Sequence, residues 1–151
     1  MAEIVRTYYE SGELESEVFV INDKMNGEFK SYYETGQLKI ICSYMNGNKH
    51  GECKSYYSNG QLHAMCTYID DMKNGTYKSY YYSNGQLSFI IMYINDKMDG
   101  MYKDYHENGQ LRKHCSYTNG KKNGICKEYH DNGELIGSFT YENDIKFDGI
   151  N

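Results

Sequence analysis

The chain lacks proline and tryptophan altogether, and only six of its 151 residues are leucine. No run approaches the roughly 18 apolar residues that a membrane-spanning helix needs. Met1 is not followed by the charged and then apolar pattern of a secretory signal. A single large core would draw more heavily on leucine, so these absences argue against an ordinary globular domain. They favour an unsecreted chain, and we expect it to be cytoplasmic.

What the chain has in abundance is tyrosine and glycine, arranged in a repeat. The stretch "SYYSNGQL" at 55–62 recurs as "SYYETGQL" at 31–38 and as "TYYESGEL" at 7–14, and its turn glycine returns every 24 or 25 residues. The turn glycines are Gly12, Gly36, Gly60, Gly85, Gly109 and Gly133. A second series follows at Gly27, Gly51, Gly75, Gly100, Gly124 and Gly149. A fixed period of this length indicates a repeat protein. We divide the chain into one repeat domain, 1–151, with units at approximately 3–26, 27–50, 51–74, 75–99, 100–123 and 124–148.

Residues between the glycines alternate in polarity, as half-buried strands do. In "GECKSYY", Cys53 and Tyr57 point to one face and Lys54 to the other. Asn59-Gly60 is a strong signal for a type I′ hairpin turn, which would place Tyr57 opposite Leu62. A turn with a glycine bulge would shift that register by one residue, but the unshifted pairing separates the two faces more cleanly.

A second turn signal in each unit leaves no room for a crossover helix. It lies at Asn22-Asp23 in the first unit and at Asn46-Gly47 in the second. The sequence therefore predicts an all-β fold, a single-layer antiparallel meander of twelve strands in about six stacked β-hairpin repeats.

These residues carry a resemblance to a known family. The unit Gly-x-x-Lys-x-Tyr-Tyr-x-Asn-Gly-Gln-Leu, followed by Tyr-x-Asn-Gly-Lys-x-x-Gly, resembles the MORN repeat over 3–149. It is most similar to the longer MORN variant of bacterial antitoxin-labelled proteins and large DNA viruses. The resemblance implies a non-enzymatic hairpin stack that serves as a scaffold, a dimerisation module or a protein-binding surface.

The cysteines occupy apolar places in the repeat. Cys42, Cys66 and Cys115 are equivalent to one another, as are Cys53 and Cys126. Equivalent places lie two strands apart, at about 9.5 Å, beyond the reach of a disulfide. We expect free, packed thiols, with oxidation open to Cys53 and Cys66 across one hairpin.

No arrangement of side chains predicts a metal site, a cofactor site or catalysis. His106 and His130 replace the second tyrosine of the Tyr-Tyr pair in the last two units. At about 9.5 Å apart they cannot share one zinc ion, so a tyrosine-like packing role is expected. The repeated serines have no fixed base beside them. We expect a protein that is not an enzyme and binds no cofactor.

Every unit keeps a cation and, two residues later, a tyrosine. The cations are Arg6, Lys30, Lys54, Lys78, Lys103 and Lys127, and the tyrosines are Tyr8, Tyr32, Tyr56, Tyr80, Tyr105 and Tyr129. This ladder fits a structural lysine lying over a ring, a protein ligand, or a polyanion. A net charge of −5 opposes nucleic acid and acidic membranes.

The leading hypothesis is a repeat scaffold that binds another protein through a tyrosine-rich face. The expected contact residues are Tyr33, Tyr57, Tyr81, Lys30, Lys54 and Lys78. Alternatives are a peripheral membrane module using the same ladder and an antitoxin-like protein that neutralises a partner. Open edge strands, at 4–9 and 135–141, make a homo-oligomer a further expectation.

Overall fold

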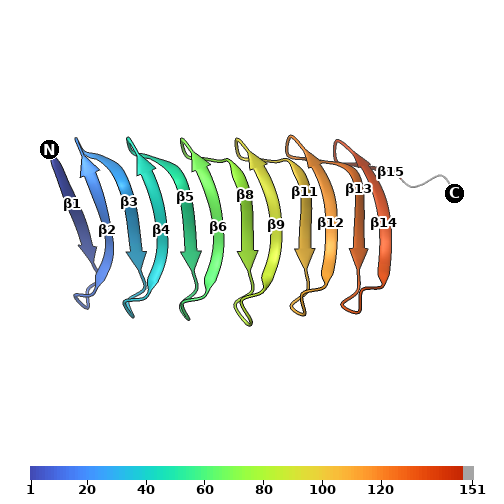
Figure 1. Cartoon of the computed structure of the whole chain (residues 1–151), viewed down its shortest axis with the longest axis horizontal. Coiled ribbons are helices and arrows are strands. Elements are labelled where there is room, and N and C mark those ends of the chain that lie inside the picture. Colours follow the sequence, from blue (N-terminus) through green and yellow to red (C-terminus); the bar gives the residue numbers. More distant parts are fainter. Residues whose placement is uncertain (148–151) are drawn as a thin grey trace. The chain divides into compact units, whose positions relative to one another are not determined.

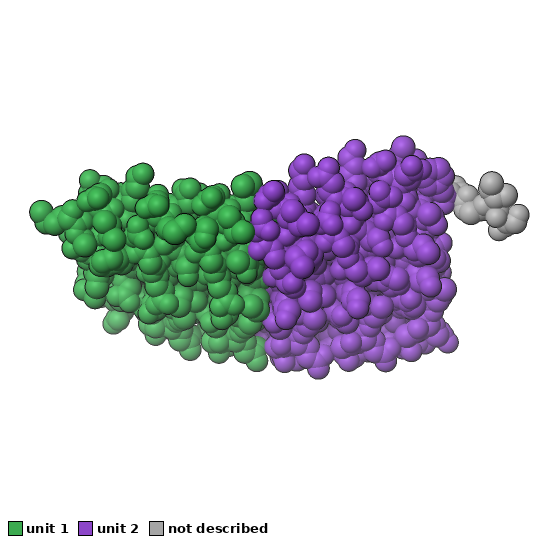
Figure 2. All heavy atoms as spheres, turned by 45° about the horizontal axis from the view of Figure 1, so that its top comes forward, with its two compact units in different colours: residues 1–73 green, residues 74–151 purple. Residues whose placement is uncertain are grey.

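The computed structural model describes residues 1–147, so Gly149, the last glycine of the second series, lies outside the described residues. The chain has two compact units, Met1–Lys73 and Asn74–Asn151 (Figure 2). Residues 1–147 contain strands and turns but no helix, and hence no helix long and apolar enough to cross a membrane.

Unit 1 is an antiparallel meander in which each strand pairs with the next in the sequence (Figure 1). Its strands are β1 (Ala2–Tyr8), β2 (Leu14–Ile21), β3 (Lys24–Tyr32), β4 (Leu38–Met45), β5 (Asn48–Tyr56), β6 (Leu62–Ile69) and the short β7 (Met72–Lys73), which pairs with β6. Strand β1 has a partner on one side only and is exposed along its whole length.

Unit 2 repeats the same arrangement. Its strands are β8 (Gly75–Tyr80), β9 (Leu87–Ile94), β10 (Lys97–Met98), β11 (Gly100–Tyr105), β12 (Leu111–Thr118), β13 (Lys121–Tyr129), β14 (Leu135–Glu142) and β15 (Ile145–Phe147). The pairing order is β8-β9-β11-β12-β13-β14-β15, and β10 pairs with β9. The predicted all-β antiparallel meander of hairpin repeats is confirmed.

Fifteen strands, rather than the expected twelve, occur among residues 1–147. Two of the extra strands arise because Asn74 and Asp99 interrupt runs that are continuous in β3, β5 and β13. The third, β15, is the start of another repeat and pairs with the end of β14.

The type I′ geometry predicted for Asn59-Gly60 occurs instead at the other connection of each repeat, for which no turn type was predicted. The type I′ turns lie at the second turn signal, where both central residues have positive φ: 49° and 60° at Asn22-Asp23, and 53° and 94° at Asn46-Gly47. The strands close directly on these pairs, with Ile21 opposite Lys24.

The Asn59-Gly60 turn is a three-residue loop with a glycine bulge, so the expected pairing of Tyr57 with Leu62 is wrong. Only Gly60 has positive φ there, 83°, and its N–H donates to the Tyr57 carbonyl at 2.9 Å. Tyr57 then pairs with Gln61, and Tyr56 lies opposite Leu62. An extra residue, His63, restores the predicted register, in which Ser55 faces Ala64 and Cys53 faces Cys66.

Restoring the register keeps the two faces of each unit distinct. The core face of unit 1 carries Val18, Cys42 and Cys66, and that of unit 2 carries Ile91 and Cys115; all five side chains are buried. Tyrosine rings cover these buried rows, for example Tyr44 against Phe29 and Tyr117 against Tyr102, both edge to face. The opposite, lysine face carries Arg6, Lys30 and Lys54 in unit 1 and Lys78, Lys103 and Lys127 in unit 2.

The expectation of free thiols is wrong for four of the five cysteines. Disulfides join Cys42 to Cys53 and Cys115 to Cys126, with Cα atoms 4.1 Å apart in each pair, and Cys66 is the free, buried thiol. The partners face each other across a type I′ connection, between the second strand of one repeat and the first strand of the next. The bonded cysteines thus lie on adjacent strands of successive repeats, neither across one hairpin nor at equivalent places two strands apart.

Candidate functional site

The predicted tyrosines lie at the hairpin tips, where they link successive repeats. The hydroxyl of Tyr33 donates to the Tyr56 carbonyl at 2.7 Å, and that of Tyr81 donates to the Tyr105 carbonyl at 2.5 Å. Tyr9 does the same with Tyr32 at 2.6 Å. These hydroxyls therefore hold one hairpin tip to the next.

The third predicted tyrosine, Tyr57, is half-buried and stacks at a tilt against His63, with ring centroids 4.5 Å apart. Burial raises the pKa of Tyr57 and of Tyr81. Lys39 lies over the Tyr33 ring, 5.5 Å from its centroid. Tyr33, Tyr57 and Tyr81, which we call the tyrosine row, are thus partly covered and partly open to contact.

His106 occupies the tyrosine position in the fifth repeat and makes the equivalent hydrogen bond to the next hairpin tip. Its Nε2 lies 3.0 Å from the Tyr129 carbonyl, and because a carbonyl only accepts, Nε2 is the protonated nitrogen. The tyrosine-like role predicted for His106 is confirmed. His130 is exposed in the sixth repeat.

The predicted lysines lie on the lysine face, away from the buried rows. Lys30 Nζ is 2.5 Å from Glu28, and Lys54 Nζ is 2.6 Å from Glu52, each pair lying along one strand. Lys78 lies in β8 directly opposite Ile90. The six predicted residues therefore form two sets, tyrosines at the tips and lysines on one face.

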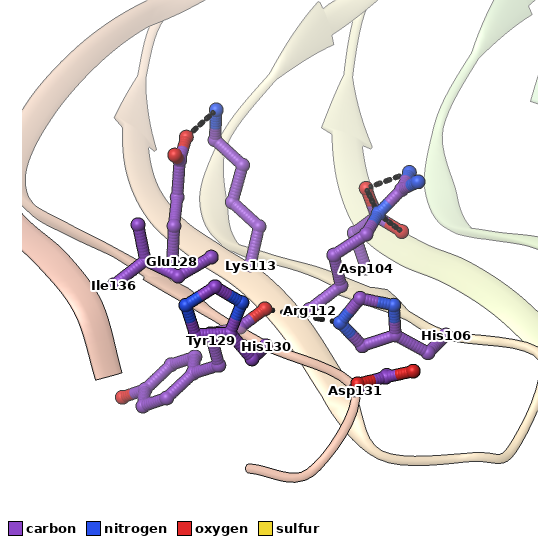
Figure 3. Close-up of a pocket in the computed structure, with 9 residues that line it drawn as sticks. All are labelled: Asp104, His106, Arg112, Lys113, Glu128, Tyr129, His130, Asp131 and Ile136. Carbon is purple, nitrogen blue, oxygen red and sulfur yellow. Dashed lines mark hydrogen bonds and ion pairs between the residues drawn. The ribbon is translucent and has the colours of Figure 1, made fainter. Parts of the chain in front are cut away.

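A hollow of about 560 Å³ in unit 2 is lined largely by charged and polar side chains (Figure 3). Its lining residues are Asp104, His106, Arg112, Lys113, Glu128, Tyr129, His130, Asp131 and Ile136. The hollow lies beside the hairpin tips of the last two repeats, and we call it the charged pocket.

Two ion pairs organise the charged pocket. Arg112 binds the buried Asp104 carboxylate through Nε, at 3.1 Å to both oxygens, and through Nη2 at 2.6 Å. The Tyr102 hydroxyl also donates to Asp104, at 3.2 Å, and burial raises the pKa of Tyr102 far above its usual value. Lys113 Nζ lies 2.7 Å from Glu128, and its hydrogen bond lowers the pKa of that carboxyl. In Figure 3 the two pairs point to opposite sides of the pocket.

The charged pocket was not predicted, although the sequence singles out His106, His130 and Tyr129 one by one and carries a further signal. Asp104 and Glu128 stand where earlier repeats have Ser31, Ser55 and Ser79. Lys113 faces Asp104 on one side and Glu128 on the other. Departures from the repeat at one place in two successive units mark the site, and register brings them together.

Within residues 1–147, no three His, Cys, Asp or Glu side chains gather closely enough to hold a metal ion.

The family profile described as MORN repeat variant matches six consecutive segments. The segments are 4–22, 25–46, 49–70, 73–95, 98–119 and 122–143. The chain belongs to the MORN repeat family. MORN repeats are commonly non-enzymatic scaffold repeats that bind proteins or lipids.

Each MORN segment begins in the first strand of a hairpin, passes through the glycine-bulge turn at its tip and ends at or beside the type I′ turn that follows the second strand. No match was found among curated protein sequences. Solved structures align with the chain at low identity. One is the GtfA/B complex bound to UDP and GlcNAc, at 12% identity over 93% of this chain and 24% of that one, with a TM-score of 0.28. Another contains accessory secretory proteins 1, 2 and 3 of Streptococcus pneumoniae, at 14% identity over 83% of this chain and 18% of that one, with a TM-score of 0.24.

A third aligned structure is a protein of unknown function from Bacteroides fragilis, at 12% identity over 93% of this chain and 81% of that one, with a TM-score of 0.16. The MORN chain spans about a quarter or less of the first two structures. TM-scores this low transfer no function to it.

Proposed function

We propose that this MORN chain is a non-enzymatic scaffold that binds another protein through its tyrosine row and lysine face. The supporting observation is the apolar surface beside the lysines. Met92, Met101 and Ile125, on the lysine face of unit 2, are 44%, 45% and 50% exposed. Exposed apolar side chains rimmed by polar groups are typical of protein contacts. The proposed contact residues are Tyr33, Tyr57, Tyr81, Lys30, Lys54 and Lys78.

The test begins with the full chain as bait in its native host, followed by mass spectrometry of the captured proteins. A purified candidate is then titrated against the chain and against Tyr57→Ala and Lys54→Ala, each checked for folding by circular dichroism. We expect about tenfold weaker binding for Tyr57→Ala, a loss of about 1.4 kcal/mol, which is larger than that of most interface residues. Unchanged affinity in both folded variants would show that the partner binds elsewhere.

A peripheral membrane module is the second candidate, because each cation of the lysine face has a tyrosine two residues along its strand. Anionic headgroups attract such cations, and the attraction weakens as salt rises. Flotation with phosphatidylserine vesicles, at low and at high salt, separates the two functions. Salt-sensitive flotation that Lys54→Ala and Lys78→Ala abolish would favour the membrane over a protein partner.

Self-association through the edge strands is a further proposal. In β1, Ile4 is 55% exposed. In β14, Thr140 to Glu142 pair with β15, which corrects the expectation that 135–141 is wholly open, whereas Leu135 and Ile136 precede that pairing and are each 54% exposed. Exposed apolar strands with unpaired backbone groups invite pairing with another chain. Light scattering over a concentration series would show a mass that rises with concentration if this proposal holds, and a constant monomer mass if it does not.

A further inference from the structure

Three lysines form a straight row across five strands of unit 2. Lys78 in β8 and Lys103 in β11 both lie opposite Ile90 of β9, while Lys103 and Lys127 of β13 both lie opposite His114 of β12. Residues directly opposite each other share a face of the sheet. The three lysines, which we call the unit 2 lysine row, therefore project from one surface.

The unit 2 lysine row differs from unit 1 in lacking acidic neighbours. In unit 1 the residue two places before each strand lysine is Glu28 or Glu52, and each forms an ion pair with its lysine. The same places in unit 2 are Thr76, Met101 and Ile125. The only acids in β8, β9, β11, β12 and β13 are Asp104 and Glu128, which belong to the core face.

No ion pair of Lys78, Lys103 or Lys127 occurs in the part of the chain that the structure describes. The pKa of His114 shows the effect of these positive charges. Its pKa is lowered by burial, and next by the charges of Lys127 and Lys103. The row is therefore a set of cations that no side chain of the described chain neutralises.

Apolar side chains flank the row. A hollow of about 260 Å³ is lined by Thr76, Ile90, Ile91, Met92, Met101 and Lys103. Its volume suits one or two small apolar side chains of a ligand. Cations and an apolar hollow on one surface fit a ligand that carries both carboxylates and apolar groups.

The spacing of the row indicates the shape of that ligand. Lysines on alternate strands lie about 9.6 Å apart, since neighbouring strands are about 4.8 Å apart. A polyproline II peptide has three residues per turn and rises about 3.1 Å per residue, so every third side chain returns to the same side after about 9.3 Å. Acids at every third position of such a peptide would match the row.

We propose that the lysine face of unit 2 binds an extended acidic segment of a partner protein, in which acidic residues recur at every third position between apolar residues. The inference rests on the proposed function and specifies its partner. The charge of the chain favours an acidic peptide over nucleic acid. Residues 1–73 contain seven basic and eleven acidic residues, a formal charge of −4. Residues 74–151 contain nine basic and ten acidic residues, a formal charge of −1. A net negative chain repels a long polyanion, whereas a short segment feels mainly the local row. Three lysines are also too few to hold a membrane surface firmly, at about 1 kcal/mol each.

The test uses a fluorescent peptide of the repeating sequence Glu-Pro-Leu ending in Glu, with four glutamates, titrated into the full chain and followed by anisotropy. A peptide of the same composition with its four glutamates clustered is the spacing control. We expect the periodic peptide to bind about fivefold or more tightly than the clustered one, and to weaken as salt rises. Equal binding of the two peptides, or none, would overturn the proposal.

The protein variants separate the row from net charge. The triple variant Lys78→Ala, Lys103→Ala and Lys127→Ala should bind the periodic peptide about tenfold less tightly. Its matched control removes three lysines near type I′ turns, Lys24→Ala, Lys97→Ala and Lys121→Ala, and should lose less than about twofold. Equal losses of peptide affinity in the two triple variants would overturn the proposal. It would also be overturned if the peptide did not bind and vesicle flotation depended on the three lysines of the row. If a native partner depends on Tyr57 but not on the row, the inference fails while the proposed function stands.

Discussion

At the scale of single residues, the hydroxyl groups at the hairpin tips connect neighbouring repeats. Tyr33 and Tyr81 donate to backbone carbonyls of the following repeat, and His106 supplies the same bond from a ring nitrogen. A backbone carbonyl at a strand end needs such a donor when water is partly excluded. The hydroxyls are therefore expected to stabilise the fold, whatever their rings contribute to binding.

Replacing Tyr81 by phenylalanine removes the hydroxyl and keeps the ring. Tyr81→Phe should lower the free energy of unfolding by about 1 kcal/mol, the usual contribution of one hydrogen bond. Urea unfolding measures the change. Tyr8→Phe is the control, because Tyr8 is 59% exposed. Equal effects of the two substitutions would mean that the Tyr81 bond contributes nothing.

Asp104 depends on Arg112 because its side chain is only 9% exposed, whereas that of Arg112 is 53% exposed. Arg112→Ala leaves a buried carboxylate without its cation and should lower the free energy of unfolding by about 2 kcal/mol. In the background Asp104→Ser, which restores the residue found at Ser79, the same substitution should have almost no effect. A double-mutant cycle by urea unfolding measures the coupling, and equal losses in both backgrounds would contradict it.

His114 makes stability depend on pH. Burial and two lysines lower its folded pKa below the usual 6.5, so the unfolded chain binds the proton more readily than the folded chain. Stability contributed by the neutral ring is full above about 6.5 and falls as the pH drops through the lowered folded pKa. His114→Gln should remove this part of the pH dependence of the melting temperature, and His130→Gln, at an exposed position, should leave it. A pH profile unchanged by His114→Gln would contradict the assignment.

At the scale of the hairpin, the two turns of each repeat use different geometry. Asp23 and Asp71 both have positive φ, 60° and 67°, at the second central position of a type I′ turn. The Asp71 carboxylate also accepts the Lys49 backbone N–H, at 2.8 Å. Two aspartates in the same conformation therefore differ in what their side chains do.

Asp23→Gly should raise the free energy of unfolding by about 0.5 to 1 kcal/mol, because glycine adopts the left-handed conformation without steric cost. Asp71→Gly gains the same relief but loses the bond to Lys49, so it should be neutral or destabilising. Thermal unfolding of the two variants measures the difference. A larger gain at Asp71 than at Asp23 would contradict the role given to that carboxylate.

The hairpin also shows which features could be predicted from the sequence and which could not. Alternation in "GECKSYY" was enough to predict the two faces, because strand periodicity is a local property. The pairing of Cys53 with Cys66 was predicted from a type I′ turn that does not form, and it holds because the bulge at His63 compensates for the different turn. Alternation could not distinguish a type I′ turn from a glycine bulge at Asn59-Gly60, since both use the same residues and the extra residue His63 hides the shift further along. The disulfides and the charged pocket were missed because they depend on contacts between successive repeats, which become visible only when the register is known.

At the scale of the whole chain, the repeats form rows, and the two units differ in what those rows carry. Lys30 and Lys54 of unit 1 are paired with glutamates, whereas the same row in unit 2 meets threonine, methionine and isoleucine. Repetition gives both units the same backbone, so the difference lies in the side chains alone. The acidic segment proposed above should therefore distinguish one unit from the other.

The most direct test of that claim is an NMR titration of the full, isotopically labelled chain with the periodic glutamate peptide. We expect amide shift changes concentrated in 76–80, 101–105 and 125–129, the three strand segments that carry Lys78, Lys103 and Lys127, with little change at the equivalent positions of unit 1. Changes of equal size around Lys30 and Lys54, or changes confined to the hairpin tips, would contradict it.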